Sequence, residues 1–368
     1  MLHIKLIKVE ISQKFKNYFN TNKLFFTNLL IIEVVSHIFY KVSFENFLLR
    51  DFEINKRVYS ESLDFYRTEL ESPFNTILVN LFQIKDADVY TLTIYLIFQM
   101  TLIFICKNLS FLGEYSTLFL FGGWLVTISW WIGFVENISV LLIILYFKNY
   151  ILGNFNRFYF YMFLLGINHF GIAIFSTLIF LILINYDKFY QILGTTLASF
   201  IVLRLYLNLV VNFGGRGRIR FIFNNNTLDS GTDFVANALR EFIWSGFMGL
   251  IFILVFILAL SKYEYVIKYT ASILFATIGA AITTDSTRIF SIILVPLLIH
   301  LILEFKNHEF SNNLHKKIIL VSVIISNILI GERFVHGQVW MTSPNQDMES
   351  VYNFFARIVN TLMKDIWV

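Results

Sequence analysis

The chain contains roughly ten long apolar runs, and these limit the folds that are open to it. Two of the runs, 246–260 and 289–303, contain no charged residue. Hydrophobic residues make up 57% of the 368 residues, and the mean hydropathy is +0.67. A membrane-spanning helix needs about 20 mostly apolar residues. The sequence therefore predicts an all-α, polytopic transmembrane protein, because a soluble domain has no need of so much apolar surface.

The apolar runs predict about 10–11 membrane spans. The number depends on 158–184, which is either one long tilted helix or two short helices broken at 166–171. Two passes place the Lys-rich connections on the same side as the basic N-terminus, as cytoplasmic loops require, so we expect two. The spans are expected at 24–40, 89–106, 115–134, 138–152, 158–184 (twice), 189–211, 239–260, 267–282, 289–303 and 318–330.

The polar segments between the runs complete a single membrane domain, 1–368. Residues 1–23 form a basic amphipathic segment on the cytoplasmic side, and 43–88 form a large outer loop. Within that loop, 75–84 is apolar but too short to cross, which favours an interfacial or re-entrant helix. Two more outer segments follow, the Arg-rich loop 212–237 and the C-terminal tail 332–368, whose end is expected to form an amphipathic surface helix over 348–368.

Charge and cysteine content exclude several classes of function. The net charge of +4 is small and lies largely in loops, so we expect it to set membrane orientation, and we expect no nucleic-acid partner. Cys106 is the only cysteine and lies inside an apolar run, which excludes an intramolecular disulfide and a Cys-rich metal site. We expect Cys106 to be a small buried hydrophobic residue. No metal or cofactor is expected, and neither a phosphate-binding loop nor an HExxH pattern is present.

An Arg-rich stretch in the outer loop 212–237 is a candidate anion site. Arg216, Arg218 and Arg220 alternate with small or apolar residues after a pair of glycines. Glycines permit close approach to the backbone, and alternate side chains of an extended segment point the same way. Guanidinium groups match phosphate oxygens bidentately, so the stretch suits a diphosphate. Alternatively, these arginines pair with nearby acids or lie against anionic headgroups.

A second candidate lies at the start of the run 289–303. Asp285 and Arg288 are three residues apart, the spacing at which helical side chains meet. Charged residues at membrane depth cost about 2.5–3.5 kcal/mol each on insertion scales, so they usually pair or line a polar cavity. Asp285 is also in the right place to be a helix N-cap, a structural role that leaves Arg288 unexplained.

His169 and the first outer loop supply candidate proton acceptors. His169 lies in the polar break 166–171, where a neutral imidazole can act as a base or as a donor to substrate. A histidine that only bonds neighbouring helices is the structural alternative. In the first outer loop, Asp64 is a candidate carboxylate for an acceptor hydroxyl, and Tyr66 and Arg67 are candidates for substrate binding. Long solvated loops also carry such charges without a function.

These motifs, read in order from Asp64 to the run 289–303, resemble the membrane polysaccharide polymerases, the Wzy-type O-antigen polymerases and their EpsG-type relatives. The acidic-aromatic stretch 64–67 is similar to the family's first outer loop. The basic turn 148–157, the following apolar run and its embedded His169 are similar to the family's central part. Arg288 corresponds to the arginine at the head of a late span. Where EpsG-type chains tend to have Arg-Gln, this chain has Glu136 and Asn137.

The resemblance implies a glycosyltransferase-C-like, membrane-embedded glycosyltransferase in the bacterial inner membrane with its active site facing the periplasm. Donor and acceptor are undecaprenyl-diphosphate-linked oligosaccharides, and a chain-length-regulating co-polymerase is a further partner. Arginines would bind the diphosphate and stabilise the leaving group. His169, Asp64 and Asp285 are the candidate proton acceptors, and we favour His169 as the base, with Asp64 or Asp285 orienting the acceptor hydroxyl.

Other functions remain open at this point. A flippase for the same lipid-linked oligosaccharide would also use arginines, but between pseudo-symmetric halves, and the chain has no internal repeat. A polyprenyl-phosphate-sugar-dependent transferase that adds single sugars would use acids of the first outer loop. A non-enzymatic co-polymerase would normally have fewer spans and a large soluble domain.

Overall fold

In a computed structural model of the chain, the described residues are 22–40, 42–44, 73–132, 136–184, 189–210, 245–260, 263–281, 286–308, 313–330 and 349–366. This part of the chain is all-α, as predicted, apart from two strands of two residues each. Its elements are α2 (Lys23–Val34), the π-helical turn η1 (Val35–Phe39), β1 (Ser43–Phe44), α4 (Pro73–Leu81), α5 (Ala87–Asn108), the 3₁₀ turn η3 (Leu109–Tyr115), α6 (Ser116–Phe119), α7 (Gly123–Trp130), α8 (Glu136–Ile151), α9 (Phe155–Asn168), α10 (Phe170–Leu183), α11 (Phe189–Leu209), the 3₁₀ turn η5 (Met248–Leu250), α14 (Ile251–Leu260), α15 (Tyr263–Ala281), α16 (Ser286–Ile293), α17 (Val295–Asn307), α18 (Asn313–Ile330), β2 (Glu349–Ser350) and α19 (Val351–Ile366).

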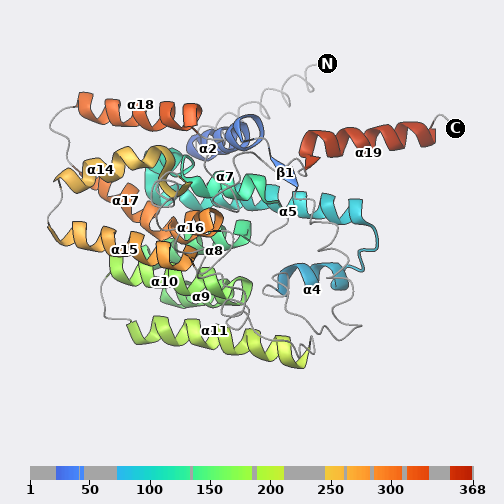
Figure 1. The fold of residues 1–368 in the computed structure, drawn as a ribbon, viewed down its shortest axis with the longest axis horizontal. Coiled ribbons are helices and arrows are strands. Elements are labelled where there is room, and N and C mark those ends of the chain that lie inside the picture. Colours follow the sequence, from blue (N-terminus) through green and yellow to red (C-terminus); the bar gives the residue numbers. More distant parts are fainter. Residues whose placement is uncertain are drawn as a thin grey trace, which may run out of the picture.

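The longer helices lie side by side along the long axis of the molecule (Figure 1), with α18 and α2 at the top of the view and α11 at the bottom. Helices α7, α8, α16 and α17 form the centre, and all eight residues of α7 are buried. Around this centre, α9 packs on α8 and α11, and α10 packs on α15. Cys106 is buried in α5, as predicted.

The break predicted at 166–171 is present, and it turns the chain back on itself. Helices α9 and α10 are separated only by His169, whose backbone is extended. Phe158, near the start of α9, lies against Phe180, near the end of α10, with ring centroids 5.5 Å apart. Since these rings lie at matching positions on either side of the turn, the two helices are antiparallel. The structure therefore has two short helices here and not one long helix.

Two of the predicted spans are not continuous helices, and this corrects the sequence-based prediction. The run 115–134 contains α6 and α7, which are separated at 120–122 beside the pair Gly122 and Gly123. Gly123 packs so closely on the backbone of Ser245 that a Cβ would meet its carbonyl oxygen. The run 289–303 contains α16 and α17, which are separated at Leu294. Pro296 is the second residue of α17 and lies in its first turn, where a missing N–H costs nothing.

The short helices predicted within the first outer loop and at the end of the C-terminal tail are also present. The apolar segment 75–84 forms α4, and the predicted amphipathic helix at 348–368 forms α19. Both lie on the right of Figure 1, together with β1. β1 pairs antiparallel with β2, and an ion pair of 2.9 Å joins Arg357 of α19 to Asp88 at the start of α5. These contacts place α19 against the end of the bundle where α5 begins.

The opposite end of the bundle collects lysines, and we call it the basic end. Lys148 donates to the Asn108 side chain at 3.0 Å, and Lys306 donates to the carbonyl of Phe111 at 3.2 Å. Lys316 lies 3.7 Å from Glu114. Lys148 and Lys306 lie near the ends of α8 and α17, whereas Lys316 lies near the start of α18, so α18 runs in the opposite direction to α8 and α17.

In the described part of the chain, two helical segments are long and apolar enough to cross a membrane, Ala87–Phe119 and Phe189–Leu209. The most apolar window of the first is 44% buried in the molecule and that of the second 28% buried. Two shorter apolar helices are Phe170–Leu183 and Ser245–Leu260. Large apolar side chains are exposed along the outer helices; examples are Val89, Leu96, Met100, Phe104, Leu197, Ile201, Leu205, Leu209, Ile318, Val321 and Ile325.

Candidate functional site

A buried ion pair joins the first turn of α16 to the first residue of α8. The Nη1 atom of Arg288 lies 3.3 Å from Oε1 of Glu136, and the two side chains are only 7% and 3% exposed. Burying two charges is costly, and the cost is recovered only when the pair is close and well bonded. Among the ion pairs of the described residues, this is the one with both side chains buried, so the protein maintains it against an unfavourable desolvation energy.

The Arg288 guanidinium also lies over an aromatic ring. Its Cζ atom is 5.1 Å from the centroid of Trp131, which follows α7. The electrons of an indole face attract a cation, and the attraction is largest where water is excluded. A hydrogen bond between Thr127 and Ser291 (2.6 Å) fixes α16 against α7, and Ser291 donates to the Arg288 carbonyl. The guanidinium is therefore held between a carboxylate and an indole ring.

The turn at His169 lies at the same end of the bundle as this ion pair. The Asn168 amide donates to the hydroxyl of Ser139 at 3.0 Å. Ser139 is three residues after Glu136 on α8, about 4.5 Å along the helix axis. Gly279, near the end of α15, packs closely on the ring of Phe175 in α10. The structure thus brings Arg288, Glu136 and the His169 turn to one end of the bundle, which we call the polar end.

The His169 imidazole has a structural contact that limits its chemistry. Its Nδ1 accepts a hydrogen bond of 3.2 Å from the backbone N–H of Ile172, so His169 is the N-cap of α10. An Nδ1 atom that accepts this bond carries no proton, and a neutral imidazole then has its proton on Nε2. In that form Nε2 is a donor. The geometry favours His169 as a hydrogen-bond donor over His169 as a base.

All of the predicted site residues other than Arg288 and His169 lie outside the described residues. These residues are Asp64, Tyr66, Arg67, Arg216, Arg218, Arg220 and Asp285. Their predicted roles therefore stay predictions. The partner expected for Arg288 was Asp285, whereas the partner in the described part of the chain is Glu136.

Glu136 is the residue of this site that the sequence did not reveal. It was noted only as a difference from the pattern of EpsG-type chains, which tend to have an arginine there. One signal was available, since Glu136 is a lone carboxylate between two apolar runs, where an ionisable residue needs a partner. The partner is 152 positions away in sequence, and no local pattern indicates it.

The arrangement is suited to binding an anion. No group of three or more His, Cys, Asp or Glu side chains that could hold a metal ion occurs among the described residues. A guanidinium has five N–H donors, so one arginine can serve a carboxylate and a phosphate together. Helices α8, α10 and α16 all begin at the polar end, and the positive ends of their dipoles favour negative charge there.

Comparison with models of known protein families, with curated proteins and with solved structures finds no match to this chain.

Proposed function

We propose that the chain is a polytopic protein of the bacterial inner membrane, with the polar end facing the periplasm and the basic end the cytoplasm. The exposed apolar side chains along α5, α11 and α18 support this proposal, because a soluble protein rarely exposes contiguous apolar surface of this extent. The lysines at one end agree with the charge bias of cytoplasmic loops.

Cysteine labelling in intact cells tests this orientation. The native Cys106 is buried and gives little background. A membrane-impermeant thiol reagent should label a cysteine placed at Asp88, at the polar end, and should label one at Glu114 only after the membrane is opened. Both positions are exposed in the structure. Labelling of both positions from the same side would exclude the proposed orientation.

Within that membrane protein we propose a surface-polysaccharide polymerase with a glycosyltransferase-C-like architecture. The buried Arg288–Glu136 pair carries the proposal, together with the resemblance to Wzy-type polymerases. A guanidinium held in a water-poor site suits the diphosphate of a polyprenyl carrier. Such a group stabilises the transition state most when it faces the negative charge that develops on a leaving group.

In the proposed reaction the bond between the anomeric carbon of the growing glycan and its carrier diphosphate breaks. A new glycosidic bond forms to a hydroxyl of the next lipid-linked repeat, and the hydroxyl proton passes to a carboxylate. Arg288 binds the diphosphate as its charge increases, and Glu136 holds Arg288 in place. His169 donates from Nε2 to substrate. Asp64, Asp285 and Glu136 are the candidate proton acceptors, and Tyr66, Arg67, Arg216, Arg218 and Arg220 are further candidates for substrate binding.

The glycan made by a deletion strain tests the function. A polymerase deletion should leave single repeats on the lipid core and no longer chains, and Arg288→Ala should not restore chain length. Loss of all repeats would favour the lipid-linked oligosaccharide flippase. Long chains that lack one side-branch sugar would favour the polyprenyl-phosphate-sugar-dependent transferase. Unchanged glycan in the deletion strain would contradict the proposal.

A further inference from the structure

A groove of about 260 Å³ lies between α2 and α18, the two helices at the top of Figure 1. Leu30 of α2 and Ile324 of α18 are 66% and 41% exposed, whereas Tyr40 and Asn327 are 2% and 5% exposed. The groove therefore has an exposed apolar rim and a buried floor, and we call it the α2–α18 groove. Its nine lining residues are Leu30, Ile31, Val34, Val35, Phe39, Tyr40, Phe121, Ile324 and Asn327.

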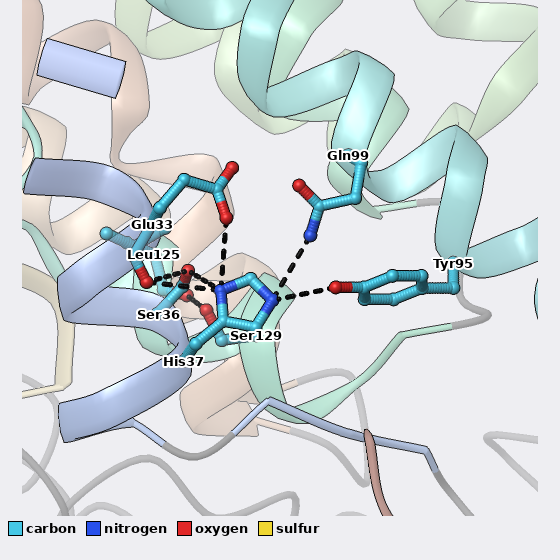
Figure 2. Close-up of polar contacts among 7 residues, drawn as sticks. All are labelled: Glu33, Ser36, His37, Tyr95, Gln99, Leu125 and Ser129. Carbon is cyan, nitrogen blue, oxygen red and sulfur yellow. Dashed lines mark hydrogen bonds and ion pairs between the residues drawn. The ribbon is translucent and has the colours of Figure 1, made fainter. Parts of the chain in front are cut away.

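The wall of the groove on α2 and η1 is fixed from other sides. His37 Nε2 lies 3.1 Å from both the Tyr95 hydroxyl and the Gln99 amide nitrogen of α5, as Figure 2 shows. Trp130, the last residue of α7, donates from Nε1 to the Tyr40 carbonyl. The wall runs from Leu30 to Tyr40, about 15 Å of helix. A volume of about 260 Å³ over this length gives the groove the shape of one hydrocarbon chain.

Asn327 brings an unused hydrogen-bond acceptor to this groove. Its Nδ2 donates to the Val323 carbonyl at 2.7 Å within α18, and a Cβ on Gly249 of η5 would lie 2.2 Å from the same nitrogen. The Nδ2 arm of the amide is therefore turned toward its own helix and η5. In the described part of the chain, Asn327 Oδ1 is buried and has no hydrogen-bond partner. Because α18 packs on η5 and α14, the groove is the side from which a donor can reach Oδ1.

Neither a water molecule nor an ionic group fits this environment. A buried water needs about two to four polar partners. Asn327 and Tyr40 are the lining residues with polar side chains, and the other seven are hydrocarbon. None of the nine lining residues is charged, so an ammonium or a phosphate would be buried there without a counter-ion. The groove therefore favours an apolar chain that carries one neutral donor.

We propose that the α2–α18 groove binds a neutral lipid alcohol from the surrounding bilayer. One hydrocarbon chain of the lipid lies along α2, and its hydroxyl donates to Asn327 Oδ1. This bond satisfies an acceptor whose burial is otherwise unfavourable. Asn327 lies near the end of α18, far from Lys316 at the basic end, and therefore near a membrane surface, where lipid hydroxyl groups lie. The bilayer as the source of the ligand rests on the proposed membrane location, whereas the preference for a neutral donor rests on the groove alone.

Photolabelling of the full chain in phosphatidylcholine nanodiscs tests the proposal, because that lipid has no hydroxyl or amide donor. The probe is a decanol with a diazirine in its chain, and mass spectrometry maps the labelled residues. We expect labels on the lining residues of α2 and α18. Decanol without the diazirine should prevent this labelling at a membrane concentration about three- to tenfold lower than decyl methyl ether, which has the same chain and cannot donate.

Two substitutions with matched controls separate the hydroxyl bond from the apolar fit. Asn327→Leu keeps the size of the side chain and removes the acceptor, so decanol and its methyl ether should then protect equally. Asn149→Leu should keep the preference for decanol, because Asn149 Nδ2 makes the same kind of bond to the Leu145 carbonyl in α8, away from the groove. Ile31→Trp fills the groove and should abolish its labelling. Ile201→Trp adds the same ring to the exposed face of α11 and should leave the labelling unchanged.

Equal protection by decanol and its methyl ether in the native protein would overturn the proposal, and this comparison requires no variant. Labels spread evenly over the exposed apolar side chains of α5, α11 and α18 would also overturn it, as would a groove that takes no label. A preference for decanol that survives Asn327→Leu would show that Asn327 does not bind the hydroxyl, and the proposal would then be wrong.

This binding measurement is independent of the proposed polymerase activity. If the deletion strain keeps its long-chain glycan, the proposed function fails, but a preference for decanol that Asn327→Leu removes still supports the lipid site. If the deletion strain loses its long chains and decanol has no advantage over the ether, the proposed function stands and the lipid site does not.

Discussion

One ion pair at the basic end and the buried ion pair at the polar end differ in what surrounds them. At the basic end, Lys316 lies 3.7 Å from Glu114, and these side chains are 27% and 79% exposed. At the polar end, Arg288 lies 3.3 Å from Glu136, and both side chains are buried. Each cation also lies over an aromatic ring, Lys316 over Tyr115 and Arg288 over Trp131.

The difference in burial decides how much each ion pair affects the stability of the protein. An exposed pair contributes about 0–1 kcal/mol, because water solvates the charges almost as well as they solvate each other. A buried pair is often no better than two apolar side chains of similar size, yet loss of one partner leaves an unpaired buried charge. A buried pair that an apolar pair could replace is therefore a candidate for function, and this is why Arg288 is central to the proposal.

The largest expected effect is that of Arg288→Ala, which leaves Glu136 buried without its partner. We expect a loss of about 3–5 kcal/mol of unfolding free energy in detergent. We also expect loss of polymer in cells. Arg288→Lys should recover part of the stability and little of the activity, because an ammonium keeps the charge and loses the planar fork.

The double variant Arg288→Met/Glu136→Leu separates stability from function. Replacement of both charges by apolar side chains should recover most of the stability that Arg288→Ala loses, because no unpaired charge remains. The double variant should still make no long-chain glycan. A stable double variant with normal chain length would show that the pair is only structural.

The second expected effect is the loss of stability when a glycine is replaced at either end of the bundle. At the polar end, a Cβ on Gly166 would lie 1.8 Å from Ser199 Oγ, so Gly166→Ala should force α9 from α11 and cost about 1–3 kcal/mol. At the basic end, Gly153 has nothing within 4 Å of such an atom, but its φ is +69°. Gly153→Asn should cost less than Gly166→Ala, because asparagine tolerates this conformation. Thermal unfolding of both variants measures the difference, and equal costs would contradict the packing argument.

The third effect is that of His169 substitutions. Asparagine is a good N-cap, so His169→Asn should keep the cap of α10, whereas His169→Ala should lose about 1 kcal/mol of stability. Because the Nδ1 contact makes His169 a donor, His169→Asn should retain part of the polymerisation rate. Complete loss of polymer in a stable His169→Asn protein would favour the original prediction that His169 is the base.

The sequence predicted those elements that depend on local pattern. The break at 166–171, the antiparallel pair that it produces, and the helices α4 and α19 all follow from polar interruptions or amphipathic spacing. The interruptions inside 115–134 and 289–303 were not predicted, because Gly122, Gly123 and Pro296 lie in runs that are apolar throughout. Window-averaged hydropathy does not register a glycine that permits a close backbone contact.

The candidate site was predictable only in part, for a related reason. Arg288 was identified because a charge stood next to an apolar run. Glu136 and the contacts of His37 were not, because their partners lie in other helices and are brought together by packing. Glu33 and His37 are four residues apart on one helix, but Tyr95 and Gln99 are added only when α5 packs on α2.

The smallest expected effect is that of Glu114→Ala at the basic end. The Tyr115 hydroxyl and Glu114 raise the pKa of Lys316 above its ordinary value of 10.5, so the folded state holds this proton more tightly than the unfolded state. A raised lysine pKa stabilises the protein below its ordinary value, and the contribution disappears as pH rises through the folded-state pKa. Glu114→Ala should therefore cost less than about 1 kcal/mol at neutral pH, and less again in high salt. Unfolding of native protein and variant at low and high salt measures this. A salt-independent loss comparable to that of Arg288→Ala would show that the two ends do not differ in the way their burial indicates.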